Sequence, residues 1–282
     1  MSEEKNFFTE LNRIEQRIIR ANEPMSSQLI FKIIRQEGEE ELARPFRALA
    51  FSALAAGIFV SFSFFFRAIL KMYLGDAQFG PIISSFGYTV GFVIVILGRM
   101  QLFTENPITT IIPLFSEPSW KKFLRVVRLW SIVFFFNVVG TAIAAIFFSS
   151  AYAVTPEISA ALHEVANHVM RLPATENVLR GIPAGIIIAA LVWVAPQTKN
   201  FRFITIVFFI YFIALGNFAH VVVGSCEMAF EVISGDADFF DYFMRFLIPT
   251  GIGNIIGGSA IFSLLIYNQV KEELHENENK KP

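Results

Sequence analysis

The sequence has little of what a water-soluble enzyme usually carries. Only 17% of its 282 residues are charged, and it holds one cysteine and four histidines. The single cysteine, Cys226, excludes an intrachain disulfide and a thiolate metal cluster. The net charge of −1 argues against a nucleic-acid partner. Because the chain shows no nucleophile–base pair, metal-ligand cluster or glycine-rich phosphate loop, we expect no enzyme activity, no cofactor and no metal site.

Apolar residues are in excess instead. They make up 54% of the chain, with 33 phenylalanines, against about 45–50% in soluble domains. They gather in runs close to the roughly 20 residues that cross a bilayer. We therefore predict an all-α membrane protein with six transmembrane helices, two of them broken, at residues 48–70, 82–98 with 102–115, 129–149, 179–195, 203–216 with 221–233, and 246–267.

The two ends of the chain are polar. We predict a flexible segment at 1–24 with no cleaved signal peptide, a transmembrane channel domain at 25–270, and a disordered tail at 271–282. Within the domain, residues 25–47 read as a cytoplasmic amphipathic helix, whose apolar stripe includes Leu29, Ile30, Ile33 and Ile34. Basic residues concentrate in 5–47, 121–128, 199–202 and 271–281. The positive-inside rule then places both termini in the cytoplasm, with the chain in a cytoplasmic (inner) membrane.

A short motif recurs in the third and sixth predicted spans. Asn137-Val138-Val139-Gly140 matches Asn254-Ile255-Ile256-Gly257 at an offset of 117 residues. The same offset carries Thr104, in the first break, to Val221, beside His220 in the second. Duplicated halves of three spans each must insert with opposite topology, which predicts an inverted 3+3 repeat with its site where the broken helices meet.

The breaks hold polar residues that are costly inside a membrane. His220 is the only histidine within a predicted span, and buried ionisable groups in membranes more often serve function than packing. Arg99, Glu105 and Glu227 also lie near the breaks, and they fit either a functional role or a structural ion-pair set. The half-helix N-termini beside them would attract anions.

These residues resemble the formate/nitrite transporter family, most closely its YfdC-like branch. The resemblance covers residues 25–270 and rests on a set of stretches, none of which would suffice alone. They are Gln101-Leu102-Phe103-Thr104-Glu105-Asn106, Ala214-Leu215-Gly216, His220-Val221-Val222-Val223-Gly224-Ser225, Arg180-Gly181-Ile182, Val192-Trp193 and Gly253-Asn254-Ile255-Ile256-Gly257-Gly258.

The resemblance implies an aquaporin-like protomer, a homopentamer, and one pore per protomer for small monovalent anions. It assigns Leu102, Phe103 and Thr104 to the loop of the first broken helix and His220 to the centre of the pore. Ungapped counting places the apolar constrictions at Tyr88, Phe92 and Ile213. The chain departs from the family at four positions, where Gln101 and Ala219 replace acidic residues, Gly185 replaces an asparagine, and Val169 replaces a basic residue of the outer vestibule.

We therefore expect a passive or proton-linked pore for a weak-acid anion, with protons, small anions and the lipid bilayer as its partners. Two other functions stay open. A water or neutral-solute channel is disfavoured because Asn106-Pro107 occurs once and has no counterpart near His220. A non-conducting membrane scaffold would have the same sequence features as a closed pore.

Overall fold

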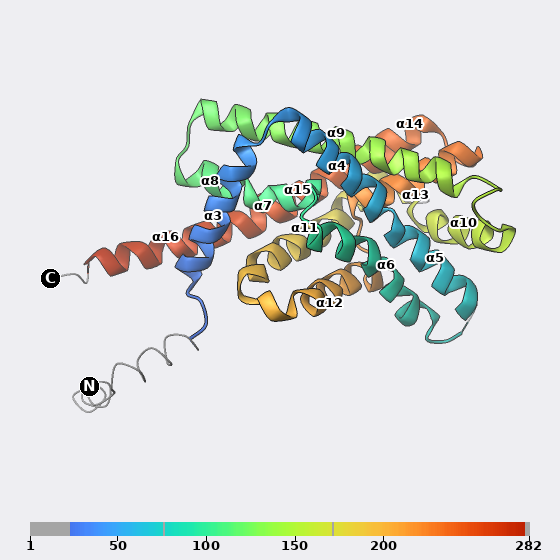
Figure 1. Ribbon diagram of the computed structural model, residues 1–282, viewed down its shortest axis with the longest axis horizontal. Helices are drawn as coiled ribbons and strands as arrows, with labels where there is room; N and C mark the ends of the chain where they lie inside the picture. Colours follow the sequence, from blue (N-terminus) through green and yellow to red (C-terminus); the bar gives the residue numbers. More distant parts are fainter. Residues whose placement is uncertain (1–22, 76, 171, 280–282) are drawn as a thin grey trace.

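The computed structural model describes residues 23–75, 77–170 and 172–279, with the backbone alone at 275–279 (Figure 1). Regular structure in these ranges is helical, and no strand occurs there. The chain is thus all-α, as predicted. The predicted flexible segment at 1–24 falls almost entirely on residues outside the described ones.

Five helical stretches of the described chain are long and apolar enough to cross a membrane. They are α4 with α5 (Phe46–Val60 and Phe62–Leu74), α6 (Gly80–Leu97), α9 (Trp120–Phe148), α11 (Ala174–Val194) extended by η2 (Ala195–Gln197), and the run from α14 (Phe239–Asp241) into α16 (Leu264–Asn279). The interrupted span predicted at 203–233 consists of α12 (Arg202–Leu215) and α13 (Val221–Ser234). Each has 14 residues, or about 21 Å, so neither alone crosses a hydrocarbon core of about 30 Å.

The last long run is irregular in its middle. Between α14 and α16 it contains η4 (Tyr242–Leu247) and η5 (Ile256–Ser263), both π-helical, on either side of α15 (Ile248–Ile255). Pro249 has no N–H to donate, which favours a shifted hydrogen-bond pattern in the preceding turn. Helix α16 then continues to Asn279, so 271–279 are helical where we predicted a disordered tail.

Short elements connect the long ones. The first break continues as η1 (Phe103–Glu105), α7 (Asn106–Thr109) and α8 (Ile111–Ser116), and η3 (Lys199–Phe201) precedes α12. Helix α3 (Ser27–Ala43) begins at Ser26, whose side chain accepts a hydrogen bond from Leu29 N–H. It buries Ile30 and Ile34 against α8 and the neighbouring helices.

Helix α10 (Pro156–Met170) lies between α9 and α11, in a segment where we predicted no span. Its buried residues Ala161, Leu162, Val165 and Ala166 form one face, which packs on α5 and α13. With 15 residues it is too short to register as a span. It lies at the end of the molecule opposite α3 (Figure 1).

The two breaks share one backbone geometry. Arg99 and Asn217 are the non-glycine residues with positive φ in the described chain, at 52° and 48°. Three residues later, Leu102 (φ −102°, ψ 125°) and His220 (φ −105°, ψ 116°) are extended. Arg99 and Asn217 are 118 residues apart, and so are Leu102 and His220. At this offset the counterpart of Val221 is Phe103, and not Thr104 as the offset of 117 residues predicted. Positive φ in these two residues is unfavourable unless the surroundings impose it.

Asn137 of α9 holds the first break in place. Its side-chain oxygen accepts from Phe103 N–H at 2.9 Å, and its amide nitrogen donates to the carbonyls of Gln101 (2.9 Å) and Ala53 (2.7 Å). Backbone groups that leave helical geometry inside a membrane need such partners. The asparagine therefore replaces the helical hydrogen bonds that the break gives up.

Asn254 of α15 does the same for the second break. Its side-chain oxygen accepts from Val221 N–H at 2.9 Å, and its amide nitrogen donates to the carbonyls of Ala219 (2.9 Å) and Gly181 (2.8 Å). The two asparagines are the residues that the sequence motif had paired. Each one ties a break to a long helix, α4 in the first case and α11 in the second.

Glycines bring those long helices close enough. A Cβ at Gly57 of α4 would lie 2.2 Å from the Asn137 carbonyl oxygen, and a Cβ at Gly185 of α11 would lie 2.2 Å from that of Asn254. No larger residue fits either place without moving the backbone. The departure from the family at Gly185 is thus a packing requirement of this chain.

Candidate functional site

The two breaks meet at a hydrogen bond between Thr104 and His220. Thr104 Oγ1 lies 2.8 Å from His220 Nε2, and both side chains are buried. Residues 116 positions apart in the sequence are thereby joined at the centre of the fold. Both residues were selected in the sequence analysis, Thr104 for the first break and His220 for the second.

The hydrogen bonds of His220 define its tautomer. Its Nδ1 accepts from Val223 N–H at 3.3 Å, which caps the start of α13. Since Nδ1 acts as an acceptor, the hydrogen of the neutral ring lies on Nε2 and is donated to Thr104 Oγ1. The Nε2–H group is therefore the donor that His220 presents at the meeting point.

Apolar side chains surround this contact. The Phe92 ring meets the His220 ring nearly edge-on at 4.9 Å, and Tyr88 lies 5.6 Å from Phe92 between ring centroids. Ile213 is fully buried. Phe103, by contrast, packs on Phe134 of α9 at 4.8 Å and lines neither of the cavities described next.

One small cavity approaches the contact from the α10 end, and we call it the His220 cavity. Of the predicted site residues, Tyr88, Ile213, His220 and Glu227 line it. Glu227 is buried there, in α13. Helix α10 contributes His168 and Val169 to the same lining, so the helix that the sequence did not predict covers part of the cavity.

Arg67 of α5 also lines the His220 cavity, and the sequence analysis did not select it. Its Nη2 donates to Asn217 Oδ1 at 2.9 Å, and its guanidinium carbon lies 5.9 Å from the centre of the Tyr88 ring. The sequence does contain a signal for Arg67, which lies inside the predicted span at 48–70. An arginine inside an apolar run is costly unless it has a role or a partner. Arg67 therefore places a positive charge in the lining of the His220 cavity, to which Val169 contributes none.

A second cavity lies on the α3 side, and we call it the Leu102 cavity. Leu102, Arg99 and Glu105 line it, together with Arg202, Gln101 and two glutamates of α3. Gln101 Nε2 donates to Glu41 Oε2 at 2.7 Å, and Arg99 pairs with Glu37 at 3.9 Å. Glu105 Oε1 is buried without a hydrogen-bond partner among the described residues.

The predicted charge set is therefore divided. Arg99 and Glu105 lie in the Leu102 cavity and Glu227 lies in the His220 cavity, with the Thr104–His220 contact between them. Arg99 is largely exposed and pairs with α3, not with the other two. A single ion-pair set of these three residues does not form.

Comparison with known proteins identifies the family and the fold of the chain. Residues 28–268 match the family model described as formate/nitrite transporter. The chain is 35% identical to inner membrane protein YfdC of Escherichia coli K12 over 251 residues, covering 89% of this chain and 81% of YfdC. It is 23% identical to formate channel FocA of Haemophilus influenzae over 243 residues, covering 77% and 84%. A solved pentameric formate channel with formate bound superposes with a TM-score of 0.68 at 17% identity, over 80% of this chain and 98% of that one.

These matches define a membrane transport protein with the fold of the formate channels. The chain belongs to the formate/nitrite transporter family, and within that family it is similar to YfdC.

Proposed function

We propose that the chain is a channel for small monovalent weak-acid anions of the formate or nitrite type. The observation that carries the proposal is the Thr104–His220 hydrogen bond, with one cavity on either side of it. The path runs from the His220 cavity past this contact to the Leu102 cavity. Relatives named as formate channels favour the same substrate class.

The architecture that we propose has six spans in an inverted 3+3 repeat, with α6 and α12 each ending at a break. The matched support by Asn137 and Asn254 favours it. So do the paired backbone angles of the breaks. In this arrangement α12 and α13 together form the span that neither can form alone.

Apolar walls would keep hydrated ions out of the path. An unpaired charge is heavily penalised where no water or polar group replaces its hydration shell. Arg67 would draw the anion into the His220 cavity. In the structure, His220 Nε2–H donates a hydrogen bond to Thr104 Oγ1. When an anion is present, the same Nε2–H can donate to the anion, so one hydrogen bond replaces another.

Proton coupling would need a second step at the same ring. His220 first takes up a proton at Nδ1, which breaks the bond from Val223 N–H, and loss of such a cap costs about 0.5–2 kcal/mol. The imidazolium then releases its Nε2 proton to the anion, leaving a neutral ring and a neutral acid. The neutral acid crosses the apolar constriction at a much lower cost than its anion.

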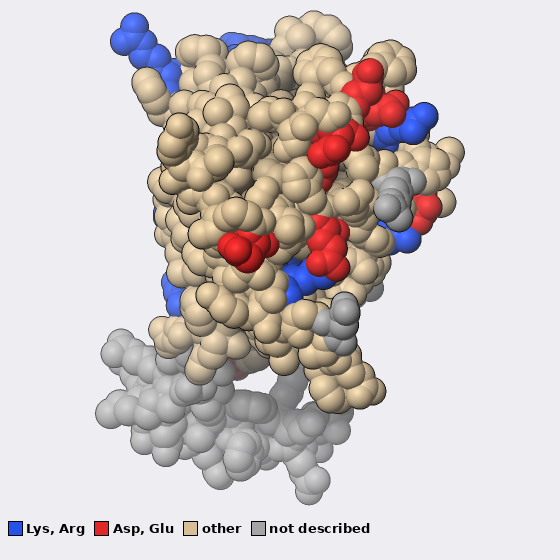
Figure 2. Space-filling view, turned by 90° about the vertical axis from the view of Figure 1, so that its right-hand side faces the viewer, with Lys and Arg blue, Asp and Glu red and all other residues tan. Residues whose placement is uncertain are grey.

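The oligomeric state and the orientation in the membrane are also proposals. We propose that the chain is a homopentamer, because the superposed formate channel is pentameric. We propose that both termini are cytoplasmic, because the basic segments at 121–128 and 199–202 lie on the α3 side. Lys122 and Arg128 bond to Glu39 and Arg44, and η2, just before residue 199, contacts α3. Figure 2 looks onto the opposite end, where α10 and α14 lie, and shows acidic side chains at several places on it.

The test is uptake of formate, acetate, nitrite and hydrosulfide into proteoliposomes, for wild type and His220→Phe, from acidic to neutral pH. We expect flux of at least one anion that varies with pH in wild type and is lost in the variant. Size-exclusion chromatography of both proteins checks that assembly is unchanged. Absence of flux for every anion would contradict the proposal, and a simultaneous rise in water permeability would favour a neutral-solute channel.

A further inference from the structure

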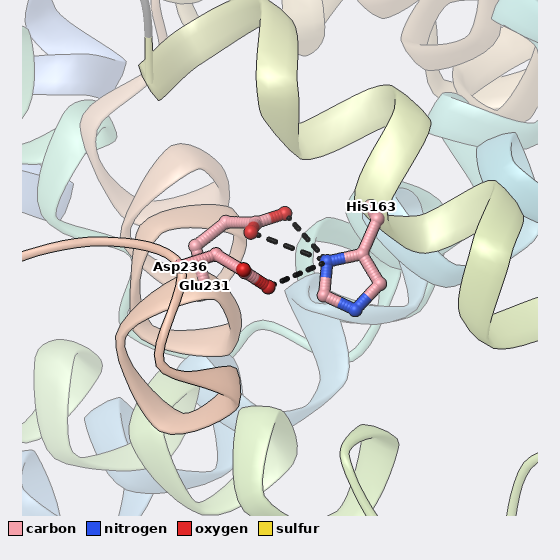
Figure 3. A group of neighbouring side chains, drawn as sticks. All are labelled: His163, Glu231 and Asp236. Carbon is pink, nitrogen blue, oxygen red and sulfur yellow. Dashed lines mark hydrogen bonds and ion pairs between the residues drawn. The ribbon is translucent and has the colours of Figure 1, made fainter.

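Three side chains converge at the α10 end of the molecule, away from the Thr104–His220 contact. His163 projects from α10, Glu231 from the last turn of α13, and Asp236 from the loop after it (Figure 3). His163 Nδ1 lies 3.2 Å from each Glu231 carboxylate oxygen and 3.6 Å from Asp236 Oδ2. Their ligand atoms all lie within 4.8 Å of one another. The sequence analysis expected no metal site because it found no metal-ligand cluster, and His163 and Asp236 are 73 positions apart in the chain.

The surrounding structure holds the three groups in position. The Glu231 side chain is only 1% exposed. Gly235, at φ 86°, ends α13 in the left-handed region, and the chain turns back so that Asp236 N–H donates to the Glu231 carbonyl at 2.9 Å. The His163 ring packs against Phe230, with 4.7 Å between ring centroids.

The cluster sets two carboxylates against one ring nitrogen. A neutral imidazole carries one hydrogen on its two nitrogens, so Nδ1 can donate to one carboxylate at most. No other hydrogen bond or ion pair of the Glu231 or Asp236 side chain occurs among the described residues. Glu231 is therefore a buried carboxylate that competes with a second one for a single donor.

We propose that His163, Glu231 and Asp236 bind a divalent transition-metal ion of the zinc class. Bonds of about 2.0–2.2 Å in a tetrahedron give about 3.3–3.6 Å between neighbouring ligand atoms. The separations of 3.2 and 3.6 Å from Nδ1 match that length. Imidazole nitrogen suits zinc, whereas calcium and magnesium take sets of oxygen ligands. Since Asp236 is exposed, the fourth position is open to water.

Such an ion would fasten α10 to the end of α13. Helix α10 supplies His168 and Val169 to the lining of the His220 cavity, and α13 begins at His220. The ion would therefore fix the position of one wall of that cavity. Metal binding itself does not depend on the proposed anion transport.

The test is zinc binding to the purified full-length chain in detergent, after treatment with a chelator and removal of any polyhistidine tag. Titration calorimetry with Zn²⁺ is expected to give one ion per chain, and no binding of Mg²⁺ at the same concentrations. His163→Ala and Asp236→Asn are expected to weaken binding at least about 100-fold, since loss of outer-shell partners alone costs about 10–100-fold.

Two controls separate the site from other effects. His168→Ala removes the next histidine of α10 and is expected to keep the affinity for Zn²⁺. Asp236→Asn changes an exposed loop residue, so its thermal unfolding without metal should match wild type, while the rise in melting temperature with Zn²⁺ should disappear. Absence of stoichiometric binding in wild type, or binding that His163→Ala leaves unchanged, would overturn the proposal and leave a structural histidine–carboxylate cluster.

Discussion

The two breaks have the same backbone and different chemistry. At an offset of 118 residues, Arg99 corresponds to Asn217, both with positive φ, and each break is held by one asparagine. Their side chains differ where function is proposed, because the counterpart of His220 is Leu102 and that of Thr104 is Val222. Each break contributes one polar partner to the central contact and an apolar residue at the other position. A duplicated scaffold can therefore support an asymmetric site.

The largest effect is expected from removing the asparagines. Asn137→Ala and Asn254→Ala each leave one N–H and one C=O of a break unpaired, and an unpaired group costs about 1–3 kcal/mol. If the breaks are equivalent, both variants should lower the melting temperature in detergent by a similar amount, on the order of 10 °C. A large loss in one variant with none in the other would break the comparison.

The next effect tests the asymmetry of the central contact. Thr104→Val keeps the shape of the side chain and removes the oxygen that accepts from His220 Nε2–H. We expect anion flux to fall about tenfold or more, since a buried donor left unpaired disturbs the ring by about 1–3 kcal/mol. Thr104→Ser keeps the hydroxyl and should retain most of the flux. Equal flux in both variants would show that the hydroxyl has no role.

A smaller effect separates the arginines near the two breaks. Arg67→Gln removes the cation that is bound to Asn217 in the His220 cavity. The half-saturating anion concentration should rise about tenfold, which corresponds to about 1.4 kcal/mol. Arg99→Gln is the matched control, because its side chain is 77% exposed and paired with α3. Concentration dependence of uptake measures both, and a larger shift in the control would reverse our assignment.

The smallest effect concerns the attachment of α3. Lys122 Nζ lies 2.6 Å from Glu39 Oε1 and 3.1 Å from Glu117 Oε2. The hydrogen bond from Lys122 and its charge, with Arg35 also nearby, lower the pKa of Glu117. A lowered pKa means stabilisation above the usual value of about 4.3 that is lost as the pH falls through the folded value.

Lys122→Met should therefore lower the melting temperature slightly at pH 7, and the difference from wild type should shrink as the pH falls below the usual carboxyl pKa of about 4.3. Lys121→Met is the control, because Lys121 is exposed and makes no ion pair with the described residues. A difference between the variants that persists at low pH would assign the effect to packing of the lysine stem.

Sequence reasoning selected the two residues of the central contact but not their surroundings. The two asparagine motifs, His220 and Thr104 stand out because polar residues in apolar runs are few. Arg67 was missed because it lies in an unbroken span, and its partner Asn217 is 150 residues away. Helix α10 was missed because its apolar face is narrow and its 15 residues are too few for a span.

The sequence by itself determined that this chain is an all-helical membrane protein, since runs of apolar residues act locally and need no partner to be recognised. It also located the breaks, because glycine and polar residues interrupt those runs. Only the tertiary structure decided that Phe103 packs outward, that the charged residues divide between two cavities, and that His163 meets Glu231 and Asp236. Those outcomes depend on the directions in which side chains point from helices that are far apart in the sequence. Helix packing determines these directions, and the periodicity of the sequence holds no information about them.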